Sequence, residues 1–156
     1  MIKESISVIG SGTMGNGIAH VFSIPDNIAK VILVDLDKTI LEKAKKNIEK
    51  NLGRQVKKNI LSSDKASDSL NKIAFVTDIN HIKDSKLVIE AVKEDIDIKK
   101  DVFNKINNLV GVNTIMASNT SSISIDKISS VTTNPENVIG MHFMNPVPVM
   151  KLVEII

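Results

Sequence analysis

Short apolar runs alternate along the chain with longer segments in which apolar residues recur every three or four positions. The six clearest runs are Ile6–Gly10, Val31–Asp35, Ile73–Val76, Leu87–Ile89, Thr114–Ala117 and Val138–Met141. Consecutive apolar positions of this kind are typical of strands that are covered on both faces. The pattern predicts a mostly parallel sheet with helices on each side, and 156 residues are enough for one such domain.

The segments between the runs predict the helices. After the first run, helical spacing is found at Met14, Ile18, Val21 and Phe22. After the second run it continues at Leu41, Ala44, Ile48, Leu52 and Val56. A helix over Lys38–Lys58 should therefore begin a long helical excursion between the second and third strands. Asp97–Leu109 is predicted to be helical, and Val149–Ile156 is a further strand candidate.

A glycine-rich motif, G-S-G-T-M-G, joins the first strand to the first helix. In such a turn the first glycine permits the tight bend, the second lets the backbone approach a pyrophosphate, and the third allows close packing of helix on strand. The N-terminus of the helix then offers free N–H groups and a partial positive charge to phosphates. The residues predicted to bind a dinucleotide here are Gly10, Gly12, Thr13, Met14 and Gly15.

Asp35 ends the second run, 20 residues after Gly15. A carboxylate in this place can accept hydrogen bonds from an adenosine ribose and repels a 2′-phosphate, and no arginine adjoins it. Together the turn and the acid predict a Rossmann-type, doubly wound domain that binds NAD in preference to NADP. The alternative is an ordinary turn followed by an exposed aspartate.

Three stretches resemble the 3-hydroxyacyl-CoA dehydrogenase family, and among its branches the bacterial 3-hydroxybutyryl-CoA dehydrogenases most closely. They are V-I-G-S-G-T-M-G-N-G-I-A, A-S-N-T-S-S at 117–122, and G-M-H-F-M-N-P-V-P-V-M-K-L-V-E at 140–154. The resemblance covers essentially the whole chain. It implies NAD-dependent oxidation of the 3-hydroxyl group of a short acyl-CoA to a ketone, and the reverse reaction, in fatty acid or butyrate metabolism.

The resemblance also implies the catalytic residues. His142 matches the family's base, which suits proton transfer near neutral pH, and Glu154 matches the acid that orients and charges it. Ser121 matches a hydroxyl that binds the substrate oxygen and lies by the cofactor. Contacts to the cofactor are implied for Glu94 and Lys99, and a contact to the cofactor or the substrate for Asn145. Without the resemblance, a single histidine near a strand end is more often structural.

The segment from Lys38 to Asn59 is strongly basic, with seven lysines and one arginine against two glutamates in a chain of net charge +2. Most such lysine stripes are simply the solvated face of an amphipathic helix. The resemblance adds that coenzyme A binds near the end of this helix, through Asn51 and Lys58. Flexible cationic side chains suit a polyphosphate.

The composition of the chain argues against several other classes of function. The chain has no cysteine, which excludes disulfides and thiolate sites, and we predict no metal site. The small net charge and the absence of Trp and Tyr argue against nucleic acid. With no signal-peptide pattern or membrane-length apolar run, the protein is expected to be cytoplasmic. His20 and His81 are expected on the surface.

The family carries a helical C-terminal domain that has no counterpart in residues 1–156, which we expect to form the NAD-binding domain alone. The resemblance implies that a full-length protein forms homo-oligomers through that second domain. Two alternative functions stay open: the NAD-binding domain of an enzyme for another hydroxy acid, and a module that binds NAD without turnover.

Overall fold

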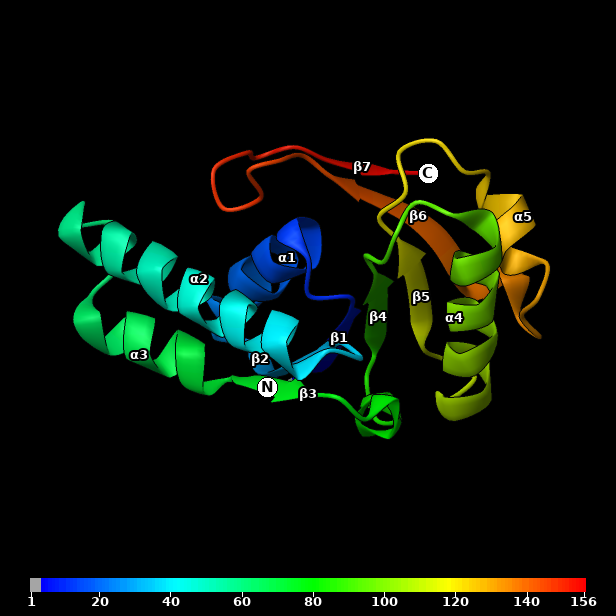
Figure 1. Cartoon of the computed structure of the whole chain (residues 1–156), viewed down its shortest axis with the longest axis horizontal. Helices are drawn as coiled ribbons and strands as arrows, with labels where there is room; N and C mark the ends of the chain where they lie inside the picture. Colours follow the sequence, from blue (N-terminus) through cyan, green and yellow to red (C-terminus); the bar gives the residue numbers. More distant parts are fainter. Residues whose placement is uncertain (1–3) are drawn as a thin grey trace.

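The computed structural model describes residues 4–156 and contains a single seven-stranded sheet in that part of the chain (Figure 1). The strands run in the order β3-β2-β1-β4-β5-β6-β7. Their bounds are β1 Glu4–Ile9, β2 Ile28–Val34, β3 Ile73–Val76, β4 Leu87–Glu90, β5 Ile115–Ser118, β6 Val138–Phe143 and β7 Val153–Ile155. All neighbouring pairs are parallel except β6 and β7, which are antiparallel. The prediction of a mostly parallel Rossmann-type sheet is confirmed.

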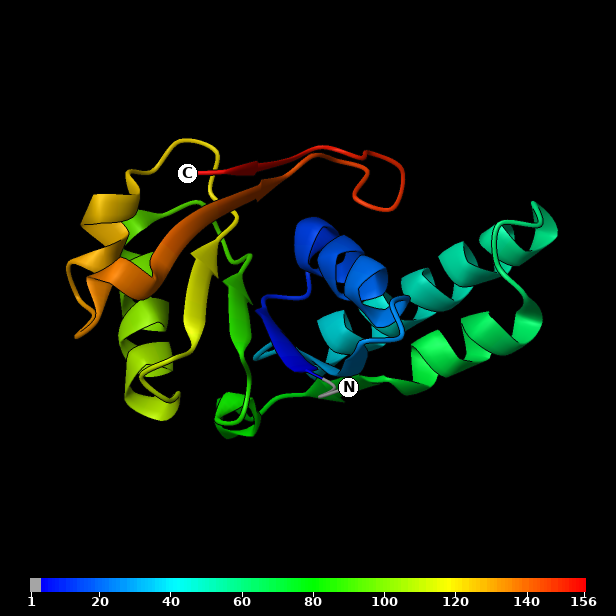
Figure 2. The same cartoon turned by 180° about the vertical axis from the view of Figure 1, so that it is seen from behind.

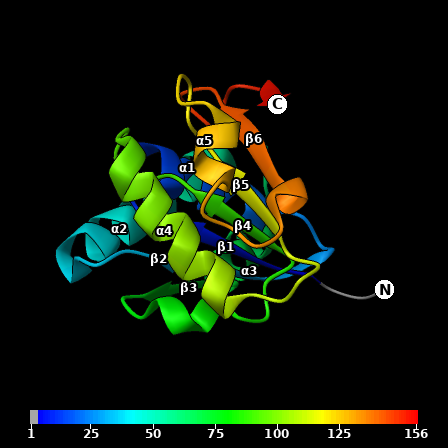
Figure 3. The ribbon, with the colours of Figure 1, turned by 90° about the vertical axis from the view of Figure 1, so that its right-hand side faces the viewer.

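Helices cover both faces of the sheet. On one side lie α1 (Thr13–Ser23), α2 (Lys38–Lys57) and α3 (Ser63–Asn71); on the other lie α4 (Ile96–Leu109) and α5 (Ile125–Ser129), which face the viewer in Figure 3. Short 3-10 helices, η1 and η2, span Ile79–Ile82 and Pro135–Asn137. The core is accordingly divided in two. Alternate strand residues enter opposite halves: Val8 packs with α1 and α2, whereas Ile9 packs with α4.

The predicted excursion between β2 and β3 is confirmed, and it consists of two helices. Asp37 begins α2 by accepting a hydrogen bond from the backbone N–H of Thr39, and Leu41, Ile48 and Leu52 bury its inner face. The chain then reverses and α3, which the apolar pattern did not predict, returns alongside α2 (Figure 2). Of the predicted strand 149–156, only Val153–Ile155 forms one.

The order of the strands places a crevice beside β1. The chain moves from β1 outward to β2 and β3 and then returns to the opposite side of β1 as β4, so the crossovers after β1 and β4 diverge. Ligands of open α/β sheets bind at such a switch point, outside the carboxyl ends of the strands. The glycine turn after β1 and the segment after β4 meet there, because the Ala91 N–H donates to the Ile9 carbonyl.

The prediction that His20 lies on the surface is wrong. Its side chain is fully buried, because α2 packs against α1 on the same face of the sheet. Its Nε2 atom lies 3.1 Å from Oε1 of Gln55 on α2, and burial lowers the pKa of His20 more than that hydrogen bond raises it. His81 is exposed, as predicted.

Candidate active site

The glycine turn has the shape that a dinucleotide requires. Gly10 has a φ of +96°, and a Cβ there would lie 2.6 Å from the Ala91 carbonyl oxygen. A Cβ on Gly15 would lie 1.8 Å from the Gly10 carbonyl oxygen. A Cβ on Gly12, by contrast, would meet no described atom within 4 Å. The first and third glycines are therefore needed for packing, and the second borders open space.

That open space lies at the N-terminus of α1. Gly12 is the N-cap residue, and no side chain of residues 4–156 caps this helix. Thr13 is exposed and Met14 half-buried at the first turn. The free N–H groups and the helix dipole therefore face a volume that can hold phosphates, so the predicted residues fit a bound dinucleotide.

Asp35 follows β2 directly and is held beside the turn. Its Oδ2 accepts hydrogen bonds from the backbone N–H of Ser11 at 2.7 Å and from the Ser11 hydroxyl at 2.8 Å. Its Oδ1 accepts a hydrogen bond from the N–H of Asp37 at 3.1 Å. The carboxylate is half-buried at the mouth of the crevice, where an adenosine ribose bound over the turn can reach it.

His142 and Glu154 form a hydrogen-bonded pair. They face each other across β6 and β7, and Nδ1 of His142 lies 2.9 Å from Oε2 of Glu154. The imidazole is 22% exposed and the carboxylate 50%. Because Glu154 occupies Nδ1, Nε2 is the ring nitrogen left for proton exchange with a ligand.

One pocket unites half of the predicted catalytic and cofactor residues. Residues from the glycine turn, the segment after β4, the segment after β5 and the end of β6 line it: Met14, Ala91, Val92, Glu94, Lys99, Asn119, Ser121, His142, Phe143, Met144 and Asn145. Ser121 and Asn145 are exposed in it. The tertiary structure thus gathers residues that are up to 131 positions apart in the sequence.

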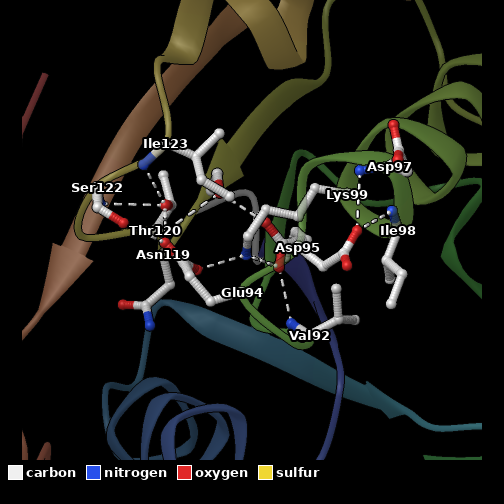
Figure 4. Close-up of polar contacts among 12 residues, drawn as sticks. Val92, Glu94, Asp95, Asp97, Ile98, Lys99, Asn119, Thr120, Ser122 and Ile123 are labelled. Atoms are coloured by element: carbon white, nitrogen blue, oxygen red, sulfur yellow. Dashed lines mark hydrogen bonds and ion pairs between the residues drawn. The ribbon is translucent and has the colours of Figure 1, made fainter.

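Glu94 and Lys99 are bonded to each other at the edge of this pocket (Figure 4). The Lys99 side chain is only 1% exposed, and its Nζ lies 2.7 Å from Oε1 of Glu90 and 3.1 Å from Oε2 of Glu94. Burial by itself raises the pKa of Glu94. Hydrogen bonds from Thr120 and Lys99, together with the Lys99 charge, outweigh it and bring that pKa below its ordinary value.

The two predicted coenzyme A residues lie in an adjoining groove. Asn51 and Lys58 line a pocket between the end of α2 and the loop after β6, with His20, Arg54, Gln55, Ile60, Pro146, Pro148 and Val149. Asn51 and Asn145 line a further pocket that also includes Thr13 and Pro146. Through these shared residues the three pockets adjoin one another in a row from His142 to Lys58. The basic face of α2 is otherwise exposed.

Sequence reasoning missed the polar residues behind the pocket wall. Glu90, Ser118 and Thr120 are buried, and Asn119 accepts a hydrogen bond from the N–H of Phe143 at 2.9 Å. One signal was available for Glu90: it is a charged residue that directly ends a buried apolar run, as Asp35 does. Among residues 4–156, no group of three His, Asp or Glu residues is arranged to bind a metal. No helix in the described part of the chain has the length and apolarity to cross a membrane.

Comparison with known proteins agrees with this geometry. Residues 5–156 match the family model described as 3-hydroxyacyl-CoA dehydrogenase, NAD binding domain. The chain belongs to the 3-hydroxyacyl-CoA dehydrogenase family. NAD is the cofactor of the domain that matches.

Relatives of this family are similar over the whole chain. A 3-hydroxybutyryl-CoA dehydrogenase of Clostridioides difficile is 43% identical over 97% of the chain and 53% of its own length. The human mitochondrial hydroxyacyl-coenzyme A dehydrogenase is 41% identical over 100% of the chain and 51% of its own length. The chain therefore spans about half the length of the 3-hydroxyacyl-CoA dehydrogenases that it matches.

Solved structures of the family share the fold closely. The 3-hydroxybutyryl-CoA dehydrogenase of Escherichia coli K12 superposes with a TM-score of 0.94 at 39% identity, over 99% of this chain and 32% of that one. The (S)-3-hydroxybutyryl-CoA dehydrogenase of Ralstonia eutropha gives 0.92 at 39% identity, over 98% and 53%.

Proposed function

We propose that this chain is the cofactor-binding part of an NAD-dependent 3-hydroxyacyl-CoA dehydrogenase that acts on short substrates such as 3-hydroxybutyryl-CoA. One observation carries the proposal: His142, which is hydrogen-bonded to Glu154, lines the same pocket as Ser121 and as Met14 of the glycine turn. A base, a hydroxyl group and a dinucleotide site in one cleft are what oxidation of a secondary alcohol needs.

In this proposal each residue has a role that its position allows. When NAD is bound, it accepts the hydride from the alcohol carbon. The Ser121 hydroxyl and Nε2 of His142 hold the substrate oxygen, and His142 takes the hydroxyl proton. Glu154, bonded to Nδ1, orients the ring and stabilises the imidazolium that forms. In the reverse direction the same imidazolium returns the proton to the oxygen.

The adjoining pockets between His142 and the end of α2 support an acyl-CoA as the substrate. An acyl group at His142 would lead the pantetheine past Asn145 and Pro146 to Asn51, with the coenzyme A phosphates near Lys58. The cationic face of α2 supplies the favourable field for that anionic end. A hydroxy acid without coenzyme A would leave the pocket at Lys58 unused.

The test is reduction of acetoacetyl-CoA by a longer protein that contains this chain, followed as loss of NADH absorbance. We expect turnover with NADH and little with NADPH, because Asp35 repels the 2′-phosphate. Turnover of acetoacetate as fast as of acetoacetyl-CoA would favour a different hydroxy acid dehydrogenase. NADH binding without any turnover would favour a binding module.

Two further expectations stay predictions. A cytoplasmic location fits the bacterial relatives, whereas the human relative is mitochondrial by name. Homo-oligomer formation through a second, helical domain follows from the family resemblance, and size-exclusion chromatography of the longer protein would test it.

A further inference from the structure

Glu90 is a buried carboxylate to which the proposed reaction gives no role. It is the last residue of β4, at the carboxyl edge of the sheet, and its side chain is 0% exposed. A buried charge is costly unless it is paired and hydrogen-bonded, and an apolar residue of similar size would be at least as stable in many cores. Its presence therefore calls for a reason beyond packing.

Both oxygens of Glu90 are fully engaged. Oε1 accepts hydrogen bonds from Nζ of Lys99 and from the N–H of Val92, each at 2.7 Å, and Oε2 accepts one from the Ser118 hydroxyl at 2.6 Å. These three partners come from α4, from the segment after β4 and from β5. A single carboxylate thus joins three elements behind the pocket wall.

Lys99 connects Glu90 to the pocket. Its ammonium group lies between Glu90, which is fully buried, and Glu94, which is 43% exposed and lines the pocket. Since Lys99 is itself only 1% exposed and both carboxylates contact its Nζ, the surface it presents to a ligand is small. Its effect on a bound cofactor must pass mainly through Glu94.

Glu94 and Glu90 in turn hold the segment that carries Ser121. The hydroxyls of Thr120 and Ser122 donate to Oε1 of Glu94 (Figure 4). The N–H of Asn119 donates to the backbone carbonyl of Glu90 at 2.9 Å. Residues 119 to 122 are therefore tied on both sides of Ser121 to the Glu94 carboxylate, and at Asn119 to the backbone of Glu90.

We propose that Glu90 is a positioning residue: by holding Lys99 against Glu94, it fixes the pocket wall of Glu94 and residues 119–122 on which the nicotinamide end of the cofactor binds. This inference rests on the proposed function, because it assumes that the cofactor extends from the glycine turn into this pocket. In the same proposal Lys99 is also a positioning residue, and it acts on the cofactor through Glu94.

The test compares NADH affinity with stability in the 156-residue chain. The chain has no Trp or Tyr, so the fluorescence of NADH itself reports binding without protein background. Glu90→Gln and Lys99→Met should each weaken NADH binding about tenfold and lower the urea midpoint. The double variant Glu90→Gln/Lys99→Met removes both buried charges, so it should regain stability but not affinity.

Ser85→Ala is the matched control. Ser85 is 2% exposed and precedes the N-terminal end of β4, whereas Glu90 is at its C-terminal end. The Ser85 hydroxyl lies 2.6 Å from that of Ser7. This variant should lose stability and keep NADH affinity. If Glu90→Gln does not fold, Ser118→Ala removes one hydrogen bond and no charge, and we expect about threefold weaker NADH binding with the fold intact.

The possible outcomes distinguish the positioning role of Glu90 from the proposed function. NADH affinity that is unchanged in the folded variants, or that recovers together with stability in the double variant, would overturn the positioning role and leave the proposed function standing. Failure of the unsubstituted chain to bind NADH would overturn both.

Discussion

The His142–Glu154 pair depends on a single register between two strands. The two residues are twelve positions apart, and β6 and β7 place them directly opposite each other, with 2.9 Å between Nδ1 and Oε2. The residue types were predicted from the sequence. Their contact required the antiparallel return of β7, because a shift of one residue would turn Glu154 to the other face of the sheet.

In a longer, active protein, His142→Gln should lower kcat by about 10²-fold or more, because the base is lost while the hydrogen-bonding shape is partly kept. Glu154→Gln should lower kcat less, since the base remains and only its negatively charged partner is removed. NADH affinity should stay nearly unchanged in both variants. Steady-state kinetics with acetoacetyl-CoA and NADH titration measure these effects, and near-normal turnover by His142→Gln would contradict the assignment.

The buried His20 should make stability depend on pH. Its pKa is lowered in the folded state from an ordinary value of 6.5, so below about pH 6.5 the unfolded chain binds a proton that the folded chain resists. The stability present at neutral pH should therefore fall as the pH decreases, by up to about 1.4 kcal/mol per pH unit from this group.

His20→Gln should remove this contribution, because a neutral amide has no proton to gain. Urea unfolding at about pH 7.5 and about pH 5.5 measures the difference. The exposed His81→Gln variant is the control and should keep the pH dependence of the unsubstituted chain. An equal loss of stability in acid with and without His20 would contradict the prediction.

At the scale of elements, the turn between β1 and α1 combines two kinds of glycine. Gly15 lets α1 pack directly on the turn, whereas Gly12 leaves space beside the helix N-terminus. The motif predicted the turn and the two elements around it. The apolar pattern predicted α2 but not α3, because α3 is short and polar on most of its surface and only Ser69 is buried.

The two glycines should respond differently to alanine. Gly15→Ala would force a Cβ onto the Gly10 carbonyl and should destabilise the chain by about 1–3 kcal/mol or more. Gly12→Ala meets no described atom, so it should leave the free energy of unfolding nearly unchanged and weaken NADH binding by crowding the phosphates. Urea unfolding and NADH fluorescence separate the two effects. Equal loss of stability in both variants would contradict this division.

At the scale of the whole molecule, the proposed active site is open to solvent. Glu154 is 50% exposed, and apolar side chains of residues 149–156 are also exposed: Val149 at 70%, Leu152 at 53%, Ile155 at 62% and Ile156 at 71%. Exposed apolar surface of this kind is a common site of association. The nucleotide crevice, in contrast, is built from the glycine turn, Asp35 and the segments after β4, β5 and β6, all of which belong to the 156-residue chain.

We therefore expect the 156-residue chain by itself to bind NADH and to reduce acetoacetyl-CoA slowly or not at all. Water has access to the His142 cleft, and hydride transfer depends strongly on holding the reacting atoms in register. NADH titration and a turnover assay on the same sample, whose mass is checked by mass spectrometry, test this. Turnover by the 156-residue species at the rate of the longer protein would contradict it.

The sequence by itself determined the class of fold and the nucleotide turn. These features are local: a strand buried on both faces is apolar at successive positions, and the glycine turn needs glycine where a Cβ would collide. The family resemblance added the roles of residues such as His142 and Ser121.

Only the tertiary structure decided which side chains share an environment. The burial of His20 beside α2, and the shared Lys99 between Glu90 and Glu94, arise from elements that meet in space and not along the chain. The spacing of apolar residues in a helix or strand shows only which face of that one element is buried. It carries no information about a second helix on the polar side or about a carboxylate arriving from another strand, and those neighbours set burial, charge pairing and pKa.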